Sequence, residues 1–181
     1  MISCNSLSVR ADSTGELILK DISATFQQGK LNAIVGPSGC GKTTLMRALL
    51  GLVKTEGEVR LGAKEKSTDG QGVAGRIGLV PQFSVSHPKL MVEEALGYAF
   101  DLTVCERSEK AQRLESVLTL IGLAEHRDKL VGSLSGGQLR RLGLGLELMS
   151  DPDCLICDEV TSGLDPLSED QILSLLLSVK S

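Results

Sequence analysis

Short apolar runs alternate along the chain with stretches whose apolar residues recur at helical spacing. The runs "LNAIV" (31–35), "RIGLV" (76–80) and "CLICDE" (154–159) predict strands, and the last is apolar until its two acids. The stretch "TLMRALLGL" after the first run predicts a helix. Strands that alternate with amphipathic helices are typical of an α/β fold with a mostly parallel sheet.

The flanking segments extend this pattern. "LSVRA" and "LILKDISATF" in the first thirty residues predict antiparallel strands beside the parallel sheet. Helical patterns fill residues 82–150, as in "MVEEALGYAF", "SEKAQRLESVLTLIGL" and "GGQLRRLGLGLELMS". We therefore predict a single domain in which residues 1–81 and 151–181 form the α/β core and residues 82–150 an inserted helical subdomain. The polar, glycine-rich residues 62–75 predict a surface loop, and "ILSLLLSV" a packed helix.

Composition narrows the possible partners. The chain has 181 residues and a formal net charge of −4, so bulk charge gives no reason to expect a nucleic acid partner. Stacking surfaces for bases are also scarce, because the aromatic residues are Phe26, Phe83, Tyr98 and Phe100. No apolar run approaches the roughly 20 residues that span a bilayer, so a membrane role needs a partner or a further part of the chain.

The five cysteines are irregularly spaced and accompany no secretory signal, which indicates a reduced, cytosolic chain. Cys154 and Cys157 form a C-x-x-C pair that could in principle serve redox chemistry or bind a metal. They lie in an apolar run with no second Cys or His pair nearby, which favours a role as small buried hydrophobes.

The sequence "GPSGCGKTT" (36–44) matches G-x-x-x-x-G-K-T between a predicted strand and a predicted helix, which is the phosphate-loop pattern in its required context. Its glycines let backbone N–H groups point at phosphate oxygens, and the helix adds its positive end. Lys42 would bind the β and γ phosphates, and the Thr43 hydroxyl would ligate Mg²⁺. The residues predicted to bind the nucleotide are Gly36, Pro37, Ser38, Gly39, Cys40, Gly41, Lys42, Thr43 and Thr44.

Two acids stand at the carboxyl end of the run "CLICDE". Open α/β sheets bind ligands at that edge, so Asp158 is predicted to hold Mg²⁺ through water. Glu159 beside it would orient and deprotonate an attacking water. The alternative, two acids that start a solvated loop, is less favoured after a buried strand in a chain with a phosphate loop.

The pentapeptide "LSGGQ" (134–138) is a second candidate anion site. Ser135 can cap a helix whose first N–H groups, at Gly136 and Gly137, would face a phosphate. This pentapeptide resembles the signature motif of ABC-type ATPases. The resemblance implies that the motif, with Gln138, closes over ATP held by a partner subunit, so that two nucleotide-binding domains form a head-to-tail dimer.

The resemblance covers nearly the whole chain in the family's order. "VPQ" (80–82) is similar to the Q-loop, which implies that Gln82 reaches Mg²⁺ and the attacking water. "CLICDE" is similar to Walker B, and "TSGLD" (161–165) resembles the D-loop, whose Asp165 would contact the shared nucleotide. The insert between Gln82 and Ser135 is too short for the long coiled coil of chromosome-maintenance and repair ATPases.

The resemblance implies an ATP- and Mg²⁺-dependent ATPase domain of an ABC transporter, coupled to a transmembrane domain or subunit at the cytoplasmic face of a membrane. "TSGLD" and "HPKLMVEEAL" are similar to the G subfamily, although bacterial transporters also use "TSGLDP". The alternatives are a soluble ABC-type ATPase of ribosomes or DNA repair, and a truncated nucleotide-binding module without turnover.

Four departures from the family pattern bear on these expectations. No aromatic residue precedes Phe26 to stack on adenine, and Val160 replaces the usual proline after Walker B. Gly143 and Gly145 in the signature helix predict a softer helix or close packing against a neighbour. The family's switch histidine would follow one more helix and strand beyond the D-loop, whereas His87 and His126 are predicted to be solvated surface residues. We therefore expect a chain that is incomplete at its C-terminus and ends within the family's core.

Overall fold

The computed structural model describes residues 1–61, 64–65, 77–82, 86–103 and 107–179. Its chain divides into two compact units, of which unit 1 is built from Met1–Gly75 and unit 2 from Arg76–Val179. The predicted boundaries of the helical subdomain, at residues 82 and 150, stay a prediction.

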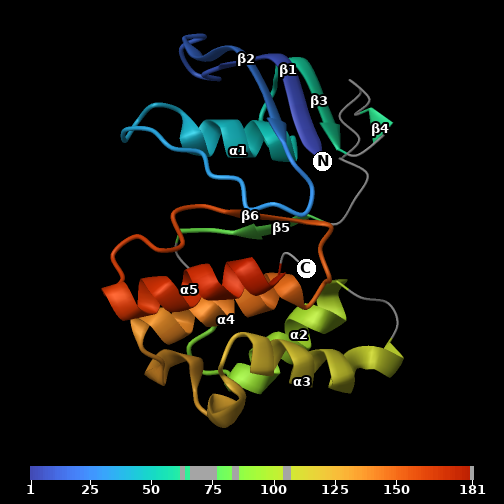
Figure 1. Ribbon diagram of the computed structural model, residues 1–181, viewed down its shortest axis with the longest axis vertical. Helices are drawn as coiled ribbons and strands as arrows, with labels where there is room; N and C mark the ends of the chain where they lie inside the picture. The colour runs from blue at the N-terminus through green and yellow to red at the C-terminus, as the bar shows by residue number, and fades with distance from the viewer. Residues whose placement is uncertain (62–63, 66–76, 83–85, 104–106, 180–181) are drawn as a thin grey trace. The chain divides into compact units, whose positions relative to one another are not determined.

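Unit 1 contains a four-stranded antiparallel sheet (Figure 1). Its strands β1 (Ile2–Arg10), β2 (Leu17–Phe26), β3 (Glu56–Leu61) and β4 (Lys64–Glu65) lie in the order β2-β1-β3-β4. Ile2 and Cys4 are buried, and after a register shift so are Leu7 and Val9, because alternate residues of a strand point to the same face. The two predicted N-terminal strands are thereby confirmed.

Helix α1 (Lys42–Leu50) follows the glycine-rich loop in unit 1, as predicted. Met46, Ala48 and Leu49 are buried on its inner face, and α1 contacts β1 and β2. Gly51 ends the helix in the left-handed conformation, at φ 73°, and its N–H donates to the carbonyl of Ala48. Gly51 therefore closes the C-terminal end of the helix, and the first turn of the helix adjoins the predicted phosphate loop.

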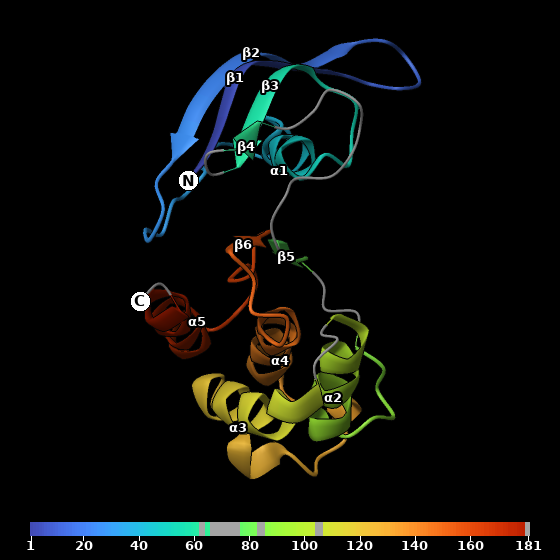
Figure 2. The same ribbon diagram turned by 90° about the vertical axis from the view of Figure 1, so that its right-hand side faces the viewer.

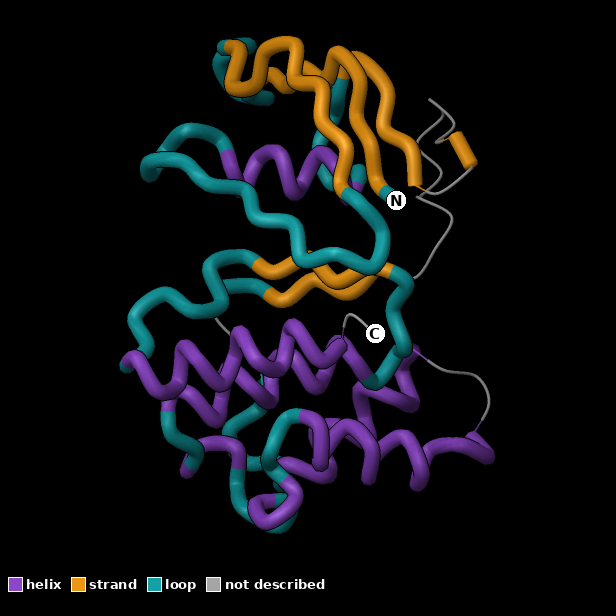
Figure 3. The backbone as a smooth tube through the Cα atoms, in the orientation of Figure 1, coloured by secondary structure: helices purple, strands orange, loops and turns teal. Residues whose placement is uncertain are grey.

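Residues 31–35 do not form the strand that their apolar character predicts (Figure 3). The Asn32 side chain donates to the carbonyls of Gln27 and Lys30, each at 3.0 Å, and so closes a turn just before this segment. A strand is held by hydrogen bonds to a neighbouring strand, and neither sheet in the described part of the chain includes residues 31–35. The prediction was wrong because apolar composition does not supply a pairing partner.

Unit 2 combines a parallel strand pair with helices. Strands β5 (Ile77–Val80) and β6 (Cys154–Cys157) pair in register from Ile77 opposite Cys154 to Val80 opposite Cys157, which confirms both predicted strands within the described residues. The helices are α2 (Val92–Thr103), α3 (Lys110–Leu120), α4 (Gly136–Leu148) and α5 (Pro166–Val179), with single-turn 3₁₀ helices at Arg107–Glu109, Ala124–His126 and Val131–Ser133.

Helix α4 lies at the centre of unit 2, between the β5–β6 pair and the helices α2 and α3 (Figure 2). Its buried face includes Leu142, Leu144 and Leu148. A Cβ atom on Gly145 would come within 2.7 Å of Ile121 and 3.2 Å of Leu96. Of the two outcomes predicted for the glycines in this helix, close packing is therefore the one observed at Gly145.

Some predicted features lie outside the described residues or differ from the structure. Of the predicted loop 62–75, only Lys64–Glu65 is described, as strand β4, and Phe83 lies outside the described residues. His87 is exposed as predicted, but His126 is half-buried, with its Nδ1 atom buried. That prediction failed because His126 ends a 3₁₀ turn that follows the buried Leu123. Among the described residues, no helix has the length and apolarity needed to cross a membrane.

Candidate functional site

The loop before α1 turns at two glycines in the left-handed conformation. Gly39 and Gly41 adopt positive φ angles of 80° and 98°, which side-chain-bearing residues rarely adopt. Gly41 is the N-cap of α1, so the loop leads directly to the helix end whose first N–H groups have no partner within the helix. Most of the loop is exposed in unit 1. The two glycines therefore permit the tight turn that the phosphate-loop pattern predicts, and this turn ends at the start of α1.

Lys42 folds back over this loop. Its Nζ atom donates to the carbonyls of Gly36 and Pro37, each at 3.0 Å. These contacts hold the ammonium group beside the loop. The ammonium can exchange neutral carbonyl partners for charged phosphate oxygens, which form stronger hydrogen bonds.

Cys40 is packed against the first glycine of the loop. A Cβ atom on Gly36 would lie 2.7 Å from the Cys40 sulfur, so a side chain at position 36 would displace it. Cys40 itself is a free, exposed thiol. Its position is therefore both inside the predicted phosphate site and open to reagents.

Gln82 and Glu159, 77 residues apart in the sequence, meet in unit 2. The Gln82 Nε2 atom donates to Glu159 Oε2 at 3.0 Å. Gln82 lies two residues after β5 and Glu159 two residues after β6, so the parallel pairing of these strands brings both side chains to one edge. The N–H of Asp158 donates to the carbonyl of Val80 at 2.9 Å and continues the pairing to that edge.

Glu159 also has an unusual backbone. Its φ is 48°, in the left-handed region that residues other than glycine seldom adopt. Its carbonyl accepts a hydrogen bond from the N–H of Ser162 at 3.0 Å, which holds the turn after the strand. Such strained residues cluster at functional sites, so the backbone of Glu159 agrees with a functional carboxylate.

A capping box starts α4 at the signature sequence. The N–H of Gln138 donates to the Ser135 hydroxyl at 3.3 Å, and the N–H of Ser135 donates to the Gln138 side chain at 2.9 Å. The N–H groups of Gly136 and Gly137 lie in the first helical turn, where a helix supplies no carbonyl for them. Because a Cβ atom on Gly136 would meet nothing within 4 Å, this helix end is open in unit 2.

Asp165 caps the next helix, α5, and is held by Ser168. The Ser168 hydroxyl donates to Asp165 Oδ2 at 2.6 Å, and its N–H donates to Oδ1 at 3.0 Å. These two bonds hold the pKa of the Asp165 carboxyl below its ordinary value. A Cβ atom on Gly137 would lie 2.6 Å from the Ser168 hydroxyl, so Ser168 lies close to the start of α4 as well as to Asp165.

The predicted site residues are distributed over both units. Residues 36–44 belong to unit 1, whereas Gln82, residues 135–138, Asp158, Glu159 and Asp165 belong to unit 2. Within unit 2 the structure brings Gln82 to Glu159. The signature residue Gly137 lies near Ser168, which was not a predicted site residue. The assignment of all these residues to nucleotide or metal stays a prediction.

Sequence reasoning missed two side chains. The first is Ser168, the third residue of the helix that Asp165 caps. Side chains at this position reach back to the capping residue, and the Ser168 hydroxyl donates to Asp165. Glu147 is a half-buried acid near the end of α4, and the N–H of Leu79 donates to it at 3.1 Å. The sequence does mark Glu147 as unusual, because it is an acid between leucines in "LGLELM", among residues that pack in the interior.

Cys154 and Cys157 are half-buried, so they are less enclosed than the predicted role as small buried hydrophobes implies. Both are free thiols on β6. Burial raises the pKa of the Cys157 thiol to about 12, and the pKa of Cys154 is also raised by burial. Because the thiolate is the nucleophile and the metal ligand, protonated thiols of this kind are poorly suited to either role at neutral pH.

Comparison with known proteins assigns the chain to a family. The family model described as "ABC transporter" matches residues 19–162, which include the phosphate loop, the signature sequence and the acids after β6. The chain belongs to the ABC transporter family.

Two curated relatives support this ABC assignment. The chain is 39% identical over 163 residues to the ABC transporter ATP-binding/permease protein Rv1747 of Mycobacterium tuberculosis, covering 88% of the chain and 19% of that protein. It is 37% identical over 183 residues to the energy-coupling factor transporter ATP-binding protein EcfA1 of Thermotoga maritima, covering 99% of the chain and 68% of that protein. The finer prediction of a G-subfamily protein stays a prediction.

A solved structure supports the fold. CbiO1 from Clostridium perfringens, described as part of the ABC transporter complex cbiONQ, matches with a TM-score of 0.88 and 26% identity over 99% of this chain and 73% of that one. The predicted fold, an α/β phosphate-loop core of the ABC type, is thereby confirmed. The chain spans only about a fifth of the mycobacterial relative, so the activity and partners of the whole protein are proposals.

Proposed function

We propose that the chain is the ATP-binding and ATP-hydrolysing domain of an ABC transporter, in which ATP binding closes a dimer and hydrolysis reopens it. The observation that carries this proposal is the hydrogen bond between Gln82 and Glu159. It joins two residues that the motifs select independently, at the edge of parallel strands where α/β folds bind their ligands. A passive phosphate-binding loop would need neither side chain.

The nucleotide would be held by residues 36–44, with backbone N–H groups and the Lys42 ammonium on its phosphates. The N-terminus of α1 would add its positive end to the same phosphates. The first aromatic residue is Phe26, at the end of β2, so adenine would be recognised without an aromatic platform nearer the N-terminus. The preference for ATP rests on the two relatives, both of which are named as ATP-binding proteins.

The donors proposed for Mg²⁺ are the Thr43 hydroxyl, the Gln82 amide oxygen and the Asp158 carboxylate, oxygen ligands of the kind that this hard cation binds. The hydrogen bond to Glu159 uses the Gln82 nitrogen, so the amide oxygen is not engaged by that bond and would be the atom that binds the cation. When bound, Mg²⁺ would neutralise charge that develops on the β and γ phosphates. Glu159 would orient the attacking water and accept its proton.

We propose that the chain also binds a second nucleotide-binding domain. The start of α4 is open at Gly136 and carries the positive end of the helix, which is suited to a phosphate, yet the same chain already carries a predicted phosphate loop. We infer that the signature end of α4 covers the nucleotide held by a partner domain, in a head-to-tail dimer with two shared sites. Asp165, whose partner Ser168 lies close to Gly137, would take part in the same interface.

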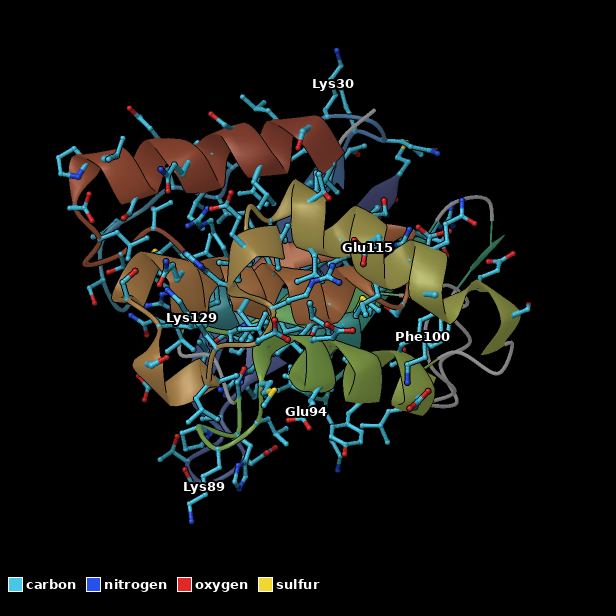
Figure 4. All side chains as sticks on the ribbon, turned by 90° about the horizontal axis from the view of Figure 1, so that it is seen from below. Lys30, Lys89, Glu94, Phe100, Glu115 and Lys129 are labelled. Carbon is cyan, nitrogen blue, oxygen red and sulfur yellow. The ribbon has the colours of Figure 1, made fainter. Side chains whose placement is uncertain are left out.

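A transmembrane partner would bind the helices that follow Gln82. Met91, Tyr98 and Leu102 on or beside α2 are 42%, 55% and 86% exposed. A cavity of about 420 Å³ beside them is lined by Met91, Glu94, Tyr98 and Lys110, among others (Figure 4 labels Glu94). We propose that this surface receives a helix of the membrane domain, which would place the chain at the cytoplasmic face of a membrane.

Cys40 supplies a chemical test of nucleotide binding. Because its exposed sulfur lies against Gly36, a thiol-alkylating reagent should place its adduct within the phosphate loop and block MgATP binding. Bound MgATP should in turn slow alkylation of Cys40 about tenfold or more at saturation, since a reagent reaches only the nucleotide-free fraction. The measurement is the labelling rate by mass spectrometry, with equal rates in the two conditions counting against the assignment.

Release of phosphate from ATP by the purified full chain tests the function as a whole. Hydrolysis should require Mg²⁺ and stop when a chelator removes the cation, because Thr43, Gln82 and Asp158 are proposed to act as its ligands. Unchanged hydrolysis in the chelator, or none with Mg²⁺ present, would refute the proposed activity.

A further inference from the structure

Glu147 connects the helix of the signature sequence to the strand that leads to Gln82. It lies in the last turn of α4, and its Oε2 atom accepts the hydrogen bond from the N–H of Leu79 in β5 at 3.1 Å. In the described part of the chain β5 has only β6 as a strand neighbour, so this N–H is bonded by a side chain in place of a further strand. A carboxylate thus fixes the backbone of β5.

The approach of α4 to β5 is close and specific. A Cβ atom on Gly78 would lie 3.2 Å from Glu147 Cβ and 3.4 Å from its Oε2, and only 2.8 Å from Leu155 of β6. Glycine at position 78 therefore lets the helix bring its carboxylate onto the strand. A larger residue there would separate Glu147 from Leu79.

Glu147 is half-buried where it meets β5. Burial raises the pKa of its carboxyl, while the hydrogen bond from Leu79 acts in the opposite direction. The carboxyl also contributes to the raised pKa of Cys157 on β6, after burial and Cys154. Desolvation of a half-buried acid costs stability, and the hydrogen bond from Leu79 offsets part of that cost.

The strand that Glu147 holds ends at Val80, two residues before Gln82. The carbonyl of Val80 accepts the hydrogen bond from Asp158, and Gln82 donates to Glu159. Gln82 follows β5, whereas Glu159 follows β6. A shift of β5 along β6 would therefore move Gln82 relative to Glu159. We propose that Glu147 is a positioning residue that holds Gln82 against Glu159, and so couples the helix of the signature sequence to the hydrolytic pair.

This inference rests on the proposed function for its effect on turnover, but its structural core can be tested without turnover. Glu147→Met keeps the length of the side chain and removes the acceptor, whereas Glu147→Gln keeps an acceptor oxygen for the N–H of Leu79. In NMR spectra of the full chain, the side-chain amide of Gln82 should shift in Glu147→Met toward its position in Glu159→Ala. In Glu147→Gln it should stay near the wild-type position, and an unshifted amide in Glu147→Met would overturn the proposal.

The turnover test separates positioning from simple structural support. Glu147→Met should lower kcat for ATP hydrolysis about 10- to 100-fold, the effect expected of a misplaced catalytic group, and leave MgATP affinity within about twofold. Glu147→Gln should restore most of kcat. In a Gln82→Ala background Glu147→Met should lower kcat little further, because Gln82→Ala already removes the contact between Gln82 and Glu159 that Glu147 is proposed to maintain.

If the effects of Glu147→Met and Gln82→Ala on kcat are fully additive as free energies, the proposed coupling of Glu147 to Gln82 is overturned, even if each substitution lowers the rate. If the wild-type chain hydrolyses no ATP, the proposed function fails, and the shift of the Gln82 amide still decides the role of Glu147. Thermal unfolding of each variant identifies any loss of folded protein.

Discussion

Lys42→Ala is expected to abolish measurable MgATP binding by the full chain. In the structure the Lys42 ammonium is fixed beside the loop by the carbonyls of Gly36 and Pro37, where it can transfer to phosphate oxygens. Removal of charged hydrogen bonds to phosphate should weaken binding about 100-fold or more. Isothermal titration with MgATP measures this loss directly.

Lys54→Ala is the matched control, because Lys54 is an exposed lysine of the same unit and lies outside the loop. It should leave the affinity for MgATP unchanged within about twofold, the size of an average surface effect. If Lys42→Ala binds MgATP as tightly as Lys54→Ala does, residues 36–44 are not the nucleotide site.

Glu159→Gln should stop hydrolysis while it preserves MgATP binding. An amide is nearly isosteric with the carboxylate and can still accept the hydrogen bond from Gln82, but it cannot take a proton from water. Loss of a general base typically costs about 100- to 10,000-fold in rate. The measurements are steady-state phosphate release and, separately, the dissociation constant for MgATP.

Glu169→Gln serves as the control for that substitution. Glu169 is an exposed acid in the first turn of α5, close in sequence to Glu159 but outside the proposed pair. Its change should leave hydrolysis within about twofold of wild type, as for other exposed surface positions. An unchanged rate in Glu159→Gln would remove Glu159 from the catalytic role.

Much of the fold and of the candidate site follows from local chemistry. The glycines of the phosphate loop predict a tight turn and a helix start, and both are observed at Gly39 and Gly41. The acids after "CLIC" predict a functional strand end, and the structure places Gln82 against Glu159 there. Ser135 and Gln138 show the spacing of a capping box, which begins α4. These features depend on residues within a few positions of one another or on one strand pairing.

The rest depends on packing between distant segments. Residues 31–35 have strand-like composition but no strand partner in the described chain, and composition cannot reveal a partner. Glu147 and Leu79 are 68 residues apart, and only the crossing of α4 over β5 joins them. The close packing at Gly145 likewise depends on Ile121 and Leu96, from separate parts of the chain. A single sequence reports which residues are apolar or acidic, but not which of them meet.

We propose that the loop of residues 36–44 in one domain and the signature end of α4 in its partner bind the same nucleotide in a dimer. Gly136→Glu is a suitable probe of the second element, because a side chain at Gly136 meets nothing within 4 Å in its own unit. A carboxylate there would repel a phosphate presented by a partner and leave residues 36–44 untouched.

The most direct test is sedimentation of the full chain carrying Glu159→Gln, with MgATP, with MgADP and without nucleotide. We expect a dimer with MgATP alone, and a monomer in all three conditions when Gly136→Glu is added, although that variant still binds MgATP. A monomer at saturating MgATP, or a dimer that Gly136→Glu does not disturb, would contradict the claim that the signature end of α4 closes over a partner's nucleotide.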